Sequence, residues 1–87
     1  MNYEARKHFE AVISDLAERE KLDRDTLRED IKIELIASGI IQYSTTELPG
    51  EALEQLADRL HQRLFYLDTN PPEYWPELDL KKLLFNS

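Results

Sequence analysis

The sequence predicts an all-α protein: a small three-helix antiparallel bundle, followed by a strap of prolines and aromatic residues and a short fourth helix. Apolar residues recur at helical spacing in three separate stretches, and β-branched residues gather in only one short segment. The 87 residues include no cysteine, so no disulfide or thiolate-bound metal can support the fold. A chain of this length forms one domain, residues 1–87, whose core needs nearly all of its large apolar side chains.

The first predicted helix covers residues 3–20. Its large apolar side chains follow the spacing i, i+3, i+4, i+7 and form one stripe, which consists of Phe9, Val12, Ile13 and Leu16. Acidic and basic residues at helical spacing mark the opposite, solvated face.

The second predicted helix begins near Asp23 or Asp25, because an aspartate can accept the free N–H groups of a first helical turn. It ends at Gly39, a residue type that favours the position just after a helix. Its apolar residues form two sets: Leu27, Ile31 and Leu35 on one face, and Ile33, Ile36 and Ala37 on another. A helix with two apolar faces contacts neighbours on both flanks, so we expect this helix to be central and the most buried.

Residues 40–46 favour an extended connector over a strand, since a single strand would need a second copy of the chain to pair with. The third predicted helix runs from Pro49 or Gly50 to Leu67, with Thr45 or Thr46 as its cap. Its apolar positions alternate spacings of four and three and form one seam: Leu53, Ala57, Leu60, Leu64 and Leu67.

The strap comprises residues 69–80, where proline fixes φ and removes backbone donors, so we expect a stiff, extended segment. In the favoured interpretation Trp75 and Tyr74 plug the open end of the bundle. In the alternative, the strap binds a protein partner through Pro71, Pro72, Tyr74, Trp75 and Pro76. A short helix at residues 77–85 follows, with Asp79 as its cap and leucines on one face.

The net charge of −7 argues against nucleic-acid binding, because such binding depends on neutralising phosphates. A helix-turn-helix regulator is the alternative function, and its base contacts would come from Arg59, His61, Gln62 and Arg63 of the third helix. Residues 1–10 lack the apolar region of a signal peptide, and no stretch approaches the ~18 apolar residues of a membrane span. We therefore expect a cytoplasmic protein with no membrane contact.

Candidate chemistry is limited to the two histidines and nearby acids. On a helical wheel Glu54, Asp58 and His61 fall within about 60° of one another, but this stripe points away from the leucine seam. We interpret His61 and His8 as surface residues and expect no metal. A catalytic role would require both imidazoles to converge with acids in a closed hollow.

The two glycines, Gly39 and Gly50, are too far apart for a phosphate-binding loop, so no nucleotide cofactor is expected. The sequence thus predicts a protein without catalytic, cofactor or metal sites. Its expected role is that of a non-enzymatic protein–protein interaction module: a regulator, an adaptor or an assembly factor. The sequence does not identify the partner, and a homodimer is an open alternative.

Overall fold

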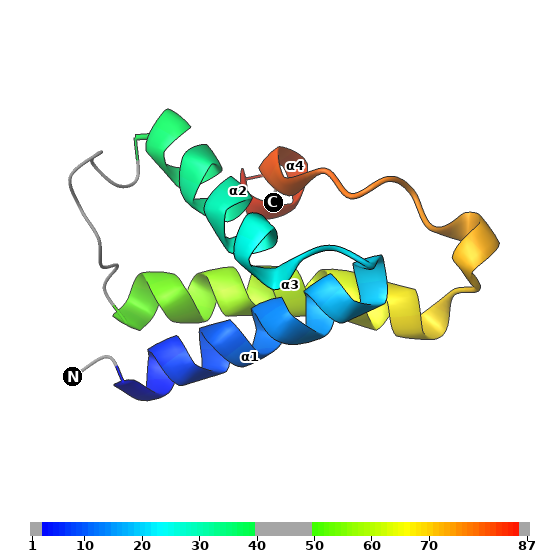
Figure 1. The fold of residues 1–87 in the computed structure, drawn as a ribbon, viewed down its shortest axis with the longest axis horizontal. Helices are drawn as coiled ribbons and strands as arrows, with labels where there is room; N and C mark the ends of the chain where they lie inside the picture. The colour runs from blue at the N-terminus through cyan, green and yellow to red at the C-terminus, as the bar shows by residue number, and fades with distance from the viewer. Residues whose placement is uncertain (1–2, 40–49, 86–87) are drawn as a thin grey trace.

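A computed structural model describes residues 3–39 and 50–85 (Figure 1). Within these ranges the chain forms four α-helices and one short 3₁₀-helix, with no strand: α1 (Tyr3–Glu20), α2 (Arg24–Ala37), α3 (Gly50–Thr69), η1 (Pro72–Tyr74) and α4 (Leu80–Phe85). The predicted all-α class is confirmed. The expectations for residues 40–46, and for Thr45, Thr46 and Pro49, lie outside the described residues.

The helices follow an up-down-up path. Helices α1 and α3 lie side by side and point in the same direction (Figure 1). Helix α2, which lies between them in the sequence, runs obliquely in the opposite direction (Figure 1). The interface between α1 and α3 is the most extensive in the structure, and α4 packs against both α3 and α2. The strap therefore leaves the end of α3 and returns the chain to the bundle at α4 (Figure 1).

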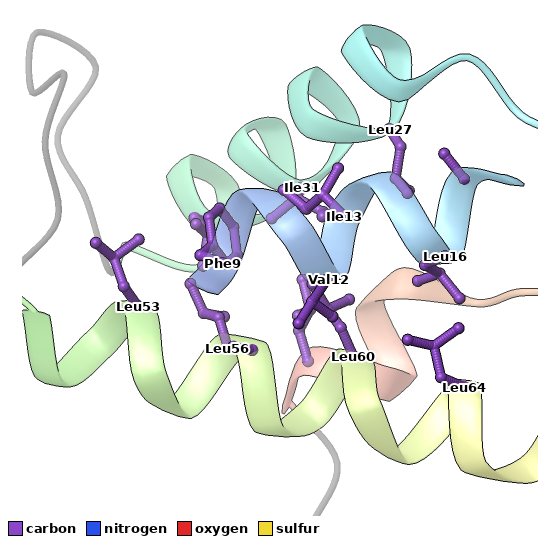
Figure 2. Packing of buried hydrophobic residues seen from close by; sticks show 14 of the residues in the cluster. Phe9, Val12, Ile13, Leu16, Leu27, Ile31, Leu53, Leu56, Leu60 and Leu64 are labelled. Carbon is purple, nitrogen blue, oxygen red and sulfur yellow. The ribbon is translucent and has the colours of Figure 1, made fainter. Parts of the chain in front are cut away.

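The core forms where the apolar stripes of the first three helices meet. Figure 2 shows side chains from α1, α2 and α3 pointing toward one another, with Val12 and Leu60 in the middle of the cluster. The largest fully buried side chains are Ile13, Leu16, Leu27, Ile31 and Leu60. Leu84 of α4 joins the same cluster. The predicted stripes of the first and third helices are thus the core surfaces.

The prediction that the second helix is central and the most buried is wrong. Only one of its two apolar sets is buried, whereas Ile33 of the other set is 59% exposed. Helix α1 packs directly along α3, whereas α2 packs against α1 and α4, so α2 is not enclosed by the other helices and needs only one apolar face. The second set of α2 is therefore left at the surface or half-buried.

Aspartates cap two of the helices, as predicted. The Asp23 carboxylate accepts a hydrogen bond from the Thr26 backbone N–H at 2.9 Å, and the Asp79 carboxylate accepts one from Lys82 N–H at 3.1 Å. After α2, Gly39 has a positive φ of 84°, a conformation that side chains disfavour. Local sequence chemistry thus determines where these elements begin and end.

Replacing Asp23 with alanine should lower the free energy of unfolding by about 1 kcal/mol, because the first turn of α2 loses the acceptor for its Thr26 N–H. Urea denaturation followed by circular dichroism measures the change. Asp23→Asn is the matched control, since asparagine caps about as well as aspartate. Equal losses in the two variants would show that the capping bond is not what stabilises this turn.

Charged pairs at the surface connect α1 to its neighbours. Arg28 of α2 donates from Nε to Glu10 Oε2 at 2.9 Å and from Nη1 to Asp25 Oδ1 at 2.7 Å. The hydrogen bond from Arg28, and then its charge, lower the pKa of the Asp25 carboxyl. Arg19 of α1 forms an ion pair with Asp68 of α3. These exposed pairs orient the helices but contribute little to stability.

Candidate functional site

The strap (residues 69–80) is not extended throughout its length. Pro72–Tyr74 forms one 3₁₀ turn, in which Tyr74 N–H donates to the Pro71 carbonyl at 2.9 Å and Trp75 N–H donates to the Pro72 carbonyl at 3.1 Å. Proline fits the start of such a turn because its φ is compatible and its missing donor would be unpaired there. The segment that follows, residues 75–79, has no regular secondary structure.

Trp75 turns toward the bundle. It is half-buried and packs against the core together with the partly buried Leu78 and Leu80. Its indole Nε1–H donates a 2.7 Å hydrogen bond to the Asn70 carbonyl. The N–H group of the ring therefore keeps a hydrogen-bond partner although the ring is half-buried. Trp75 therefore anchors the strap to the protein's own core.

Arg63 of α3 is a second anchor, and it is the only charged residue that is buried within the described ranges. Its Nε donates to Glu20 Oε2 at 2.5 Å, and its Nη2 donates to the Pro76 carbonyl at 2.8 Å. The two side chains of this ion pair are only 9% and 11% exposed. One guanidinium thus joins the end of α1, the middle of α3 and the strap.

Sequence reasoning missed this role of Arg63 and placed the residue among candidate DNA contacts. A signal was present, because Arg63 lies three residues after Leu60 and four before Leu67, on the leucine seam itself. Since Arg63 is buried beneath the strap, it is not available to read base edges.

The outer side of the strap presents an aromatic ring to solvent. Tyr74 is 67% exposed, although its backbone carbonyl accepts a 3.1 Å hydrogen bond from the Tyr66 hydroxyl. Phe65, on the last two turns of α3, is equally exposed. Of the five predicted partner-binding residues, Trp75 is half-buried, and four are exposed: Pro71, Pro72, Tyr74 and Pro76.

A groove runs along the inner edge of the strap. One hollow of about 500 Å³ lies between the strap and the turn from α1 to α2, and a second of about 530 Å³ lies between α2 and the start of α4. The two share several lining residues, so we treat them as one strap groove. Its apolar lining consists of Leu22, Leu27, Ile33, Pro72, Trp75, Pro76, Leu78 and Leu80.

The exposed charges around the strap groove are mostly negative. Asp30 and Glu34 of α2 line it, as do Glu77 and Asp79 of the strap. Lys81 is the single exposed basic residue among the described residues of the lining, because Arg63 is neutralised by Glu20 at the bottom of the groove. The sequence does not reveal this grouping, since the acids come from separate segments.

The two histidines lie close together, His8 on α1 and His61 on α3. The His8 and His61 ring centroids are 5.8 Å apart, and His8 lines a hollow of about 260 Å³ with Glu4, Glu54 and Asp58. All five side chains are exposed, so the hollow is open to solvent. No group of three or more histidine, cysteine or acidic residues in the described ranges is arranged to hold a metal ion.

The histidines are therefore surface residues, as interpreted from the sequence, but they are not separate from each other. Their proximity follows from the parallel packing of α1 on α3, which no sequence pattern predicts. Of the two imidazoles only that of His8 lines the hollow with the acids, and the His61 ring lies beside His8, so the two do not converge with acids in a closed hollow.

None of the described helices is long and apolar enough to cross a membrane. Comparison of the chain with family models, curated proteins and solved structures finds no match. The strap, its anchors and the groove beside it therefore form the candidate functional site.

Proposed function

We propose that this protein is a non-enzymatic protein–protein interaction module, a regulator, adaptor or assembly factor that contacts its partner through the strap. The observation that carries the proposal is the exposed Tyr74 ring on a backbone that is held in place. The Tyr66 hydroxyl binds the Tyr74 carbonyl, Trp75 packs on the core, and Arg63 binds the Pro76 carbonyl.

Such an arrangement favours binding for an entropic reason. Ordering a flexible loop on association costs free energy, whereas a segment already ordered by its own anchors avoids much of that cost. Prolines on both sides of Tyr74 restrict the backbone further. Exposed aromatic side chains on ordered segments are typical anchors of protein interfaces.

Two other functions have less support. The histidines and acids between α1 and α3 are exposed, which disfavours an enzyme because general acid–base groups work best where water is excluded. The helix-turn-helix alternative loses Arg63 as a base contact.

We also propose a cytoplasmic location, which is supported by the absence of cysteine from the sequence.

Replacing Tyr74 with alanine tests the proposal. Because this side chain is 67% exposed and the hydrogen bonds of Tyr74 are made by its backbone N–H and carbonyl, the free energy of unfolding should change by less than about 0.5 kcal/mol. Recovery of the partner from native extract should fall at least about tenfold, as for an interface anchor. Mass spectrometry of the co-purified material measures this, and size measurement shows whether the partner is a second copy of the chain.

Tyr3→Ala is the matched control. Tyr3 is 66% exposed on the first turn of α1. The start of α1 lies at the opposite end of the bundle from the strap (Figure 1). Its loss should leave partner recovery unchanged. Equal recovery with both variants, or no specific partner for the unmodified chain, would contradict the proposed function.

A further inference from the structure

We infer that the strap groove binds a basic amphipathic helix of a protein partner. The apolar side chains of that helix contact the apolar lining of the groove. Its lysine or arginine side chains contact the acidic rim of the groove, which consists of Asp30, Glu34 and Glu77. This inference rests on the proposed function, because it specifies the chemistry of the segment that such a partner would contribute. It concerns a surface to which three of the five predicted strap residues, Pro72, Trp75 and Pro76, contribute together with residues of α2 and α4.

The apolar part of the groove is open to a ligand. Ile33 is 59% exposed on α2, and Leu22 is exposed in the turn before that helix. Leu78, Leu80 and Trp75 are only partly buried and continue the apolar surface along the strap. Apolar surface that remains accessible in a groove with polar edges is typical of a binding site.

The wall formed by α2 suits a helical ligand. Asp30, Ile33 and Glu34 follow the spacing i, i+3, i+4, so they lie on one face of α2, where Asp30 and Glu34 share a ridge and Ile33 lies beside it. Such ridges pack into the grooves of a neighbouring helix. An amphipathic helix could therefore cover Ile33 with its apolar face while its flanking residues meet the acids.

The charge of the rim determines which amphipathic helix fits. Asp30, Glu34 and Glu77 form no ion pair or side-chain hydrogen bond with any part of the chain that the structure describes. Their charges are available to a partner, and they favour lysine and arginine while repelling acidic segments. A second copy of this chain, with its net charge of −7, is a poor complement.

Trp75 offers a direct measurement, because it is the only tryptophan of the chain and it lines the groove. The probe is a synthetic amphipathic peptide of about 14 residues, long enough for four helical turns, that contains only leucine and lysine. We expect it to change the emission of Trp75 on binding. Its affinity should fall as salt rises from about 50 to about 500 mM, because the added ions screen the rim.

A peptide with glutamate in place of every lysine is the ligand control and should bind at least about tenfold more weakly. On the protein, the rim variant combines Asp30→Lys, Glu34→Lys and Glu77→Lys and should lose at least about tenfold in affinity for the lysine peptide. The matched protein control reverses the same number of exposed acids elsewhere, at Asp15, Glu54 and Asp58, and should retain binding.

Ile33→Ser tests the apolar contact separately and should weaken binding without unfolding the protein, since Ile33 is largely exposed. Circular dichroism verifies that every variant is folded. The inference would be overturned if the two peptides bound equally, if neither bound at millimolar concentration, or if the rim variant and its control were indistinguishable.

The outcomes also separate this inference from the proposed function. If the rim variant still recovers a partner from extract while Tyr74→Ala does not, the groove does not bind the partner and the strap does. If the lysine peptide binds as expected but Tyr74→Ala loses no partner, the groove is the binding surface and the outer strap is not.

Discussion

Replacing Arg63 with methionine is expected to lower the free energy of unfolding by about 3–5 kcal/mol, the largest effect of any change considered for this protein. The substitution leaves the Glu20 carboxylate, which is 11% exposed, without its counter-charge. It also removes the donor to the Pro76 carbonyl, so the strap loses one anchor. Urea denaturation followed by circular dichroism measures the loss of stability.

Two further variants identify its cause. The double variant Glu20→Leu with Arg63→Met should recover much of the stability, because replacing both members of a buried pair by apolar residues removes the desolvated charge. Arg19→Met breaks the exposed pair with Asp68 and should cost less than about 1 kcal/mol. A loss below about 1 kcal/mol for Arg63→Met itself would show that the pair is solvated in solution.

Replacing Trp75 with alanine should lower the free energy of unfolding by about 3 kcal/mol, the low end of the range for buried tryptophans, because the ring is half-buried. The loss combines the packing of the indole on the core with its hydrogen bond to the Asn70 carbonyl. Thermal and urea denaturation measure it on the same preparation.

Trp75→Phe separates these two contributions, since it keeps much of the packing and removes only the N–H donor, at a cost of about 1 kcal/mol. Comparison with Tyr74→Ala is equally informative. If Trp75 were a partner anchor like Tyr74, neither substitution would change stability and both would abolish recovery of the partner. A stable Trp75→Ala protein would therefore reverse the roles assigned to the two neighbouring rings.

Local patterns predicted the elements well. The first helix was expected at residues 3–20 and is Tyr3–Glu20, because an apolar stripe with solvated charges opposite it describes a surface helix completely. Either Asp23 or Asp25 was expected to cap the second helix, and Asp79 the fourth. Asp23 and Asp79 are caps, since the acceptor and the N–H groups lie within three residues of each other. The third helix continues two residues beyond the expected Leu67, where hydrogen bonds from Asn70 to Tyr66 close its last turn.

Arrangement in space was harder to predict. The two apolar sets of α2 were interpreted as two buried faces, but pattern alone does not say how many neighbours a helix has. Arg63 was named as a candidate base contact of a helix-turn-helix regulator, yet its long side chain reaches a carboxylate distant in the sequence, that of Glu20. The sequence named the strap as the candidate partner-binding segment but could not tell that Trp75 packs on the core whereas the Tyr74 side chain is exposed.

The sequence by itself determined which segments are helical, where caps and prolines end them, and that the chain carries excess negative charge, because each property depends on neighbours within about one helical turn. Only the tertiary structure decided that α1 packs on α3, that Arg63 joins Glu20 to the strap, and that Ile33 lies exposed beside the acids of the strap groove. These depend on contacts between residues dozens of positions apart, which are selected by how whole apolar faces fit together and not by any local spacing.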